Sequence, residues 1–240
     1  MITWEPSKEN FDFARDLTWT RNLAGLNYCF KIEGRDLIIG FKETNGDADD
    51  WAINFEFFPL AFDIFPGSKI KAHEGFAKKY LSVRKEIMGL LYSGDFDNIY
   101  VGGFSQGGSI SQLCVQDIGF HIDRDKEEYK HLANVKVMGI SYDGARPFCT
   151  TQGSKIKKAV KGRLFTIKNY WDPVTWMPLR IMPTFFSFRW KPLEIRLRVP
   201  TISFWRDYGK IIHIGKLWRV LPIQHEPEQM KRNLLERFGK

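Results

Sequence analysis

A serine between glycines is the feature of this 240-residue sequence that most clearly indicates chemistry. Residues 103–107 read G-F-S-Q-G, which matches the pattern G-x-S-x-G of a nucleophilic serine on a sharp strand-to-helix turn. A purely structural glycine turn is the alternative, but the β-branched run before the motif and the G-G-S opening of a helix after it favour a nucleophile. We therefore predict that Ser105 attacks the substrate and that the backbone N–H of Gln106, at the helix start, is one oxyanion donor.

A serine nucleophile needs a base, and the base needs an acid to orient it. Where this turn occurs in hydrolases, the acid and then the histidine follow the serine in the chain. Asp172 lies just past an expected strand at 164–167, and Pro173 keeps it out of helical geometry, which suits a fixed loop carboxylate. Asp143 competes for the same role, but the adjacent Gly144 indicates an ordinary turn residue.

Four histidines follow Ser105, and chain order separates them into two pairs. His121 and His131 precede Asp172, so the order acid-then-base disfavours both. His213 and His225 follow the acid. The order of residues alone leaves these two open as the base.

The elements that must position these residues alternate between strands and helices. Residues 26–33 and 37–41 form β-rich runs around a turn at 34–36, and apolar residues spaced by three and four predict an amphipathic helix over 75–92. Further strands are expected at 99–103, 135–142 and 164–167, with a helix after Ser105 to about Ile118. This alternation predicts an α/β fold with a mostly parallel central sheet and helices on both faces.

Residues 176–206 interrupt the alternation. They mix large aromatic residues with arginine and lysine, and four prolines prevent one long helix. Such a composition suits the interface of an anionic membrane, although aromatic residues packed as core with basic residues outward explain it equally well. The phenylalanine-rich stretch 56–65 is a candidate cover over a pocket.

Composition limits the class of protein. With 43% hydrophobic and 27% charged residues, the chain has an ordinary globular balance. No signal peptide or membrane-spanning stretch is recognised, and the three cysteines have no zinc or disulfide spacing, so we expect a cytoplasmic protein. The net charge of +8 favours anionic partners or simply keeps the protein soluble, and no motif predicts specific nucleic-acid binding.

Five motifs in order resemble those of the class 3 lipases, also called fungal-lipase-like hydrolases, from about Leu37 to Leu234. The strand end F-R-G-T/S with a later D-W resembles residues 41–44 and 50–51, and H-x-G-F matches residues 73–76. G-H-S-x-G-G resembles residues 103–108, and a G-x-x-H-x-G motif resembles residues 209–215 with one extra residue. N-x-x-D-x-V-x-x-x-P is matched by Asn169, Asp172, Val174 and Pro178.

This resemblance implies one α/β-hydrolase domain over residues 1–240, with an insertion at about 176–206, that cleaves carboxylic esters of acyl or lipid type. It implies that Ser105 and Asp172 are nucleophile and acid and that Thr44 is the second oxyanion donor. The family's catalytic histidine lies just before a short closing helix. His225 fits this position, whereas His213 matches a non-catalytic histidine. Such a triad requires no metal or organic cofactor.

Three residues depart from the family pattern. Glu43 replaces the glycine of the oxyanion loop, Phe104 replaces the histidine before the serine, and Met230 replaces an aromatic residue. Glu43 keeps open the alternative of an inactive relative that binds a lipid surface or partner. The sequence F-S-Q-G-G also resembles the carboxylesterase and acyl-thioesterase branch of the same fold. Acyl chain length, leaving group and oligomeric state are not specified by the sequence.

Overall fold

The structure is a computed structural model of all 240 residues. It describes every residue except 1–5, 16–19, 22–23, 45–57, 63, 65–67, 125–126, 150–152, 171, 191–194, 215–224 and 240. Of residues 13–15, 21, 182–190 and 195–202 it describes the backbone alone.

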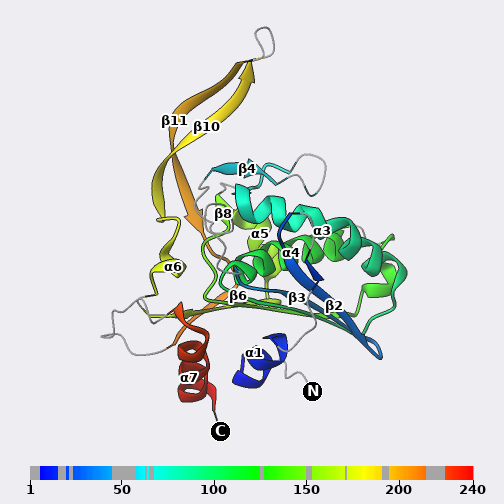
Figure 1. The fold of residues 1–240 in the computed structure, drawn as a ribbon. Coiled ribbons are helices and arrows are strands. Elements are labelled where there is room, and N and C mark those ends of the chain that lie inside the picture. Colours follow the sequence, from blue (N-terminus) through cyan, green and yellow to red (C-terminus); the bar gives the residue numbers. More distant parts are fainter. Residues whose placement is uncertain are drawn as a thin grey trace.

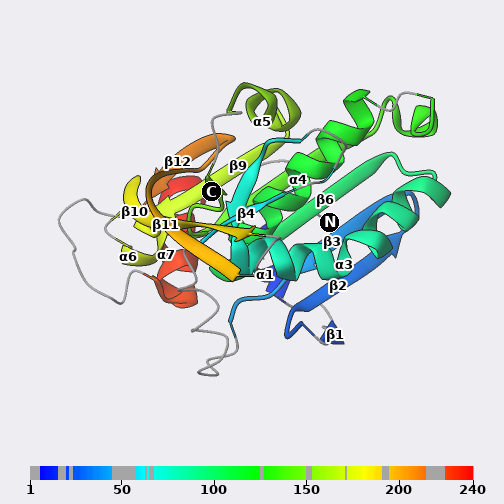
Figure 2. The ribbon, with the colours of Figure 1, turned by 90° about the horizontal axis from the view of Figure 1, so that it is seen from above.

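A seven-stranded sheet forms the centre of the molecule (Figure 1). Its order is β1-β2-β3-β6-β7-β9-β12 (Figure 2). Strands β3 to β12 run parallel, while β1 and β2 are antiparallel to their neighbours. The bounds are β1 (Thr20–Arg21), β2 (Asn27–Glu33), β3 (Asp36–Phe41), β6 (Asn98–Phe104), β7 (Lys136–Tyr142), β9 (Leu164–Asn169) and β12 (Lys210–Ile214). The predicted mostly parallel sheet is confirmed.

Helices cover both faces of this sheet (Figure 1). One face carries α3 (Glu74–Ser93), α4 (Gln106–Arg124) and α5 (Gly153–Val160), and the other carries α1 (Lys8–Arg15) and α7 (Pro227–Phe238). The apolar core is divided accordingly, with Ile39 and Ile87 in the cluster under α3 and α4, and Ile38 and Leu234 in the cluster under α7. Because both faces of β3 are covered, consecutive residues of this strand are buried. This is the predicted α/β-hydrolase arrangement.

Local sequence explains the elements around the sheet. The turn between β2 and β3 places Gly34 at φ +61°, a conformation that glycine adopts without steric cost. The apolar stripe predicted over 75–92 lies on one side of α3, where its side chains are buried. The helix after Ser105 continues beyond the expected Ile118 to Arg124. Among the described residues, no helix is long and apolar enough to cross a membrane.

A second sheet of five antiparallel strands lies beside the helical layer, in the order β10-β11-β8-β5-β4. Its strands are β4 (Pro59–Ala61), β5 (Lys71–His73), β8 (Phe148–Cys149), β10 (Ile181–Trp190) and β11 (Ile195–Arg206). The segment 176–206, for which the prolines only excluded a long helix, is therefore mostly a hairpin that extends away from the body (Figure 1). Of the predicted cover at 56–65, residues 56, 57, 63 and 65 lie outside the described residues, and Phe62 is fully buried in the same core cluster as Ile39 and Ile87.

Candidate active site

Ser105 occupies the tight turn between the end of β6 and the start of α4. Its φ of +55° is unusual for a residue with a side chain and holds its backbone in the strained conformation expected of a nucleophile turn. The flanking glycines make this turn possible. A Cβ on Gly103 would lie 2.6 Å from the carbonyl oxygen of Phe41, and one on Gly107 would lie 2.0 Å from the same oxygen. Only glycine therefore allows the end of β3 to approach the start of α4 this closely.

Gln106 is the first residue of α4, and the N–H groups of the first helical turn point out of the helix end, toward Ser105. The side chain of Gln106 accepts a hydrogen bond from Nζ of Lys79 at 3.0 Å, and Lys79 on α3 is only 1% exposed. The Ser105 amide donates to the carbonyl oxygen of Tyr142 at 2.9 Å. The N–H of Ser105 is thus hydrogen-bonded to the end of β7, whereas the N–H of Gln106 belongs to the first turn of the helix beside the serine.

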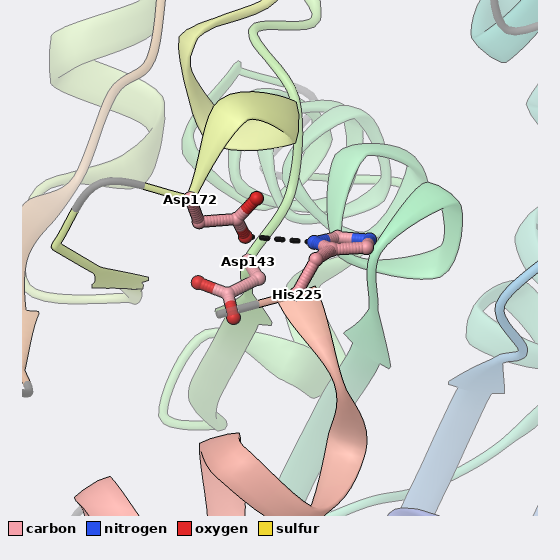
Figure 3. Close-up of side chains that lie close together, drawn as sticks. All are labelled: Asp143, Asp172 and His225. Atoms are coloured by element: carbon pink, nitrogen blue, oxygen red, sulfur yellow. Dashed lines mark hydrogen bonds and ion pairs between the residues drawn. The ribbon is translucent and has the colours of Figure 1, made fainter. Parts of the chain in front are cut away.

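His225 lies between Ser105 and Asp172. Its Nε2 is 2.7 Å from Oγ of Ser105, and its Nδ1 is 2.7 Å from Oδ2 of Asp172. Figure 3 shows the second of these contacts, with the imidazole edge facing the carboxylate. The three side chains predicted from the sequence are therefore brought together, although 67 and then 53 residues separate them along the chain (172 − 105 and 225 − 172).

Asp172 is held at the N-terminus of the short helix α6 (Pro173–Trp176) and is fully buried. Its Oδ1 accepts from the backbone N–H of Val174 at 2.8 Å, and its carbonyl oxygen accepts from the Thr175 hydroxyl at 2.9 Å. One carboxylate oxygen thus caps the helix while the other faces His225. Pro173 as the first helical residue enforces the extended conformation of Asp172, as the sequence predicted.

A buried ion pair supports the loop that carries Asp172. Nζ of Lys168 on β9 contacts the carboxylate of Asp207 at 2.6 Å and donates to the carbonyl oxygen of Thr175 at 2.9 Å. Arg146 contacts the Asp207 carboxylate at 3.6 Å and donates to the carbonyl oxygen of Pro178 at 2.9 Å. Burial lowers the pKa of the Arg146 guanidinium. The residues around α6 are therefore tied both to β9 and to the end of β11.

Asp143, the competing acid, follows β7 and does not hold the imidazole. Its two oxygens accept from the backbone N–H and the side-chain amide of Asn169, at 2.7 and 2.6 Å. Figure 3 shows it next to Asp172 and His225, and one atom of each of the three lies within 4.8 Å of the other two. In the described part of the chain this is the one group of side chains that could hold a metal, but hydrogen bonds already engage these atoms, so we assign no metal there.

The other histidines have different surroundings. His213 lies on β12 and stacks on Tyr170, with ring centroids 5.1 Å apart, and burial lowers its pKa. His121 contacts the buried Asp117, and His131 hydrogen-bonds the carbonyl oxygen of Leu91. His73 stacks on Phe76. His225 is the histidine whose two ring nitrogens face both Ser105 and Asp172.

Thr44 lies three residues beyond β3, whose end runs beside the Ser105 turn. Among the described residues other than glycine, a positive φ occurs at Ser105 and Asp143. Glu43 thus enters the loop with an ordinary backbone conformation and does not need the freedom of the glycine it replaces. The residues that resemble the D-W part of this motif, 50–51, and Gly215 of the later motif lie outside the described residues.

A serine hydroxyl, an imidazole and a carboxylate in series, beside the N-terminus of a helix, can perform acyl transfer. The family model described as lipase (class 3) matches residues 38–182, which is more than half of the chain. The chain belongs to the class 3 lipase family. Family membership makes it a lipase-type carboxylic ester hydrolase, as the motifs predicted.

Solved lipases share the fold of this class 3 lipase. A triacylglycerol lipase from Penicillium expansum aligns with a TM-score of 0.53 at 10% identity, covering 82% of this chain and 68% of that one. A lipase from Rhizopus microsporus var. chinensis aligns with a TM-score of 0.52 at 16% identity, covering 99% and 79%. A triacylglycerol lipase whose catalytic centre is described as a serine protease triad gives 0.52 at 16%, covering 85% and 77%. A search of curated proteins gives no significant match.

Several residues of the site were not anticipated from the sequence. Lys79 and Asp207 contact the site from α3 and from the loop after β11, and nothing in their local sequence indicates burial beside Gln106 and Lys168. The sequence identifies Asp143 only as an alternative to Asp172. The available signal was its place directly after a buried parallel strand, where polar residues gather at the carboxyl edge of a sheet.

Proposed function

We propose that this class 3 lipase hydrolyses acyl esters through an acyl-enzyme, with Ser105 as nucleophile, His225 as base and Asp172 as acid. The observation that carries the proposal is the pair of 2.7 Å contacts made by the two ring nitrogens of His225. These contacts have the lengths and the order of a working serine triad. The serine protease triad described for one similar lipase supports the same assignment.

In the proposed reaction, Ser105 Oγ attacks the acyl carbon while His225 Nε2 takes its proton. The oxyanion that forms accepts hydrogen bonds from the backbone N–H groups of Gln106 and Thr44. His225 then gives the proton to the leaving alcohol oxygen as the C–O bond breaks, and the acyl group remains on Ser105. A water molecule, deprotonated by His225, repeats the sequence and releases the acid. Asp172 keeps Nδ1 protonated and stabilises the imidazolium in both halves.

A fluorophosphonate probe tests this proposal, because it labels a serine only when a base activates it. We expect labelling of the wild type and none of Ser105→Ala, whose small side chain fits the same turn. A panel of p-nitrophenyl esters of rising acyl length then measures chain-length preference, and matched thioesters separate an esterase from an acyl-thioesterase. Absence of labelling in a folded wild type would favour the alternative of an inactive relative.

We further propose that the enzyme meets its substrate at an anionic lipid surface, through the base of the β10–β11 hairpin. Four large apolar side chains there are about half exposed or more: Trp176, Leu179, Ile181 and Phe204, at 48%, 53%, 62% and 50%. Ile181 and Phe204 are paired across the two strands. The exposed Arg180 directly precedes Ile181, and the exposed Arg206 lies two residues after Phe204. An apolar patch with cations at its edge fits an anionic bilayer interface. It adjoins α6, whose first residue follows Asp172.

Vesicle co-sedimentation tests the lipid proposal. Each basic residue near an anionic surface contributes about 1 kcal/mol, and salt screens that attraction. Binding should therefore rise with anionic lipid content, fall with sodium chloride, and weaken in Ile181→Ser with Phe204→Ser and in Arg180→Gln with Arg206→Gln. The control is Ile32→Ser, which removes a side chain that is 54% exposed on β2. Equal binding to neutral and anionic vesicles, or none to either, contradicts the proposal.

The basic residues farther along the hairpin, Arg189, Lys191, Arg196 and Arg198, are also predicted to contribute, although their side chains lie outside the described residues. Replacing them with glutamine should weaken vesicle binding without changing turnover of a short soluble ester. The cytoplasmic location expected from the sequence stays a prediction, and cell fractionation tests it.

A further inference from the structure

A second carboxyl group is buried beside the proposed triad. Asp143 has no exposed surface and adopts a φ of +46°, outside the usual range for a residue with a side chain. This backbone conformation turns its side chain from the end of β7 toward the end of β9, where both oxygens accept from Asn169. The proposed reaction gives Asp143 no role, since Asp172 already holds the imidazole.

Asn169 links Asp143 to the two segments that carry the acid and the base. Its carbonyl oxygen accepts from the backbone N–H of Asp172 at 3.4 Å. Its side-chain oxygen accepts from the amide of Asn233 at 2.8 Å, and Asn233 in turn accepts from Gln229 at 2.8 Å. Asn233 and Gln229 belong to α7, the helix that begins two residues after His225. Asp143 therefore fixes the residue that joins the acid loop to the helix behind the base.

The carboxyl groups of Asp172 and Asp143 have different hydrogen-bond partners. Asp172 faces His225 with one oxygen and accepts from the backbone N–H of Val174 with the other. Both oxygens of Asp143 accept from neutral N–H groups of Asn169. The charged and titratable groups around it are Asp172, Lys168 on β9 and His225. Burial, and then the charge of Asp172, raise the pKa of Asp143 well above its usual value. The hydrogen bonds from Asn169 and the charge of Lys168 favour the ionised form and oppose this rise only in part.

We propose that Asp143 is a positioning residue of the triad, which carries the proton of a carboxyl pair with Asp172 and fixes Asn169. One negative charge then faces His225, and the imidazolium formed during each proton transfer is balanced by Asp172 alone. One oxygen of Asp143 lies within 4.8 Å of one oxygen of Asp172, and both carboxyl groups are fully buried. Two buried carboxyl groups so near each other do not both ionise readily, so the pair retains a proton. This inference rests on the proposed function, because it assigns Asp143 through its effect on His225 and Asp172.

The proposed carboxyl pair leads to a prediction that would not follow if Asp143 had a purely structural role. In Asp172→Asn the neighbouring charge is gone, so the pKa of Asp143 falls and its carboxyl ionises. A negative charge is thereby restored near His225, although in a less favourable position. Asp172→Asn should then retain more activity than a triad that has lost both carboxyl groups.

The first experiment observes the proton directly, by carbon NMR of enzyme labelled at the aspartate carboxyl carbon. We expect one protonated aspartate signal at neutral pH in the wild type, absent from Asp143→Asn, and an ionised or more acidic Asp143 in Asp172→Asn. If Asp143→Asn does not fold, the comparison of wild type with Asp172→Asn still decides. A wild type whose aspartates are all ionised at neutral pH overturns the inference, whatever the enzyme hydrolyses.

The second experiment is a double-mutant cycle on kcat. We expect Asp143→Asn to cost a few-fold and Asp172→Asn about 10³-fold, with the double variant at least tenfold worse than the product of the two. If the double variant loses only the product of the two single losses in kcat, Asp143 does not replace the charge of Asp172. That result overturns the inference, although the proposed function stands. If the wild type shows no Ser105-dependent hydrolysis, the proposed function fails instead, and the NMR titration still reports on the carboxyl pair.

Discussion

The ring of Phe104 stacks on the imidazole of His225, with centroids 5.2 Å apart and ring planes inclined by 22°. Phe104 is the residue before the nucleophile, and Phe11 of α1 packs edge-on against its ring at 5.6 Å. The departure from the family's histidine at this position therefore supplies a flat apolar surface beneath the proposed base. The stack limits rotation of the imidazole out of the line between Ser105 and Asp172.

We predict that Phe104→Leu lowers kcat about three- to tenfold. Leucine is close in size but lacks the ring face, and an aromatic pair is worth about 0.5–1.5 kcal/mol beyond its buried area. Steady-state kinetics with a short p-nitrophenyl ester measure the effect, and the melting temperature shows whether the core has suffered. Unchanged kcat with a lowered melting temperature would restrict Phe104 to packing.

We predict that His225→Ala loses at least about 10⁴-fold in kcat, as Ser105→Ala does, because members of a triad act as a unit. His213→Ala should keep most of its activity, since that ring stacks on Tyr170 at the edge of the sheet. The same soluble ester serves for all three variants. The reverse ranking of the two histidine variants would make His213 the base.

We predict that Gly107→Ala both destabilises the protein and reduces activity. The added Cβ would lie 2.0 Å from the Phe41 oxygen and 2.9 Å from the Lys42 oxygen, so the loop that leads to Thr44 must move. Gly89→Ala in α3 is the matched control, because a Cβ there meets nothing within 4 Å and alanine favours a helix by roughly 1 kcal/mol. Urea unfolding and kcat of both variants give the comparison, and equal behaviour contradicts the prediction.

We predict a pH-dependent stability difference between Asp143→Asn and the wild type. Because the pKa of Asp143 is raised in the folded state, the native protein binds more protons than the unfolded chain above about pH 4. The wild type therefore loses stability as pH rises toward the folded pKa, by up to about 1.4 kcal/mol per pH unit, and asparagine removes this loss. In urea unfolding from pH 4 to 8, the free energy of unfolding of the variant minus that of the wild type should increase with pH. A difference that does not change with pH refutes the prediction.

The central sheet could be predicted from the sequence because its signals are local. Apolar runs such as 135–142, and the spacing of apolar residues in 75–92, determine element type without reference to the rest of the chain. The second sheet has no such signal. Its strands β4 and β8 have three and two residues, and β11 pairs with β8 across more than 50 residues of sequence (205 − 149). The interpretation of residues 1–240 as one domain stays a prediction.

The candidate site was predictable to a similar extent. Ser105, Asp172 and His225 follow from a motif, from chain order and from the resemblance to a family, and their catalytic roles stay predictions. The role proposed for Asp143 was not accessible, since it depends on a positive φ and on the approach of Asn169 from another strand. The stacking of Phe104 likewise depends on its approach to His225, which lies far from it in the sequence.

The position of His225 beside the last described helix also has a consequence for folding. Helix α7 is anchored by Met230 and Leu234, which are fully buried in the cluster that also contains Phe11 of α1. Because α7 begins two residues after His225, its packing against the sheet fixes the start of the helix next to the proposed base. A folding chain in which residues 227–238 have not yet packed would hold the proposed nucleophile and acid without this anchor for His225. We therefore expect alignment of the proposed base to follow the docking of α7.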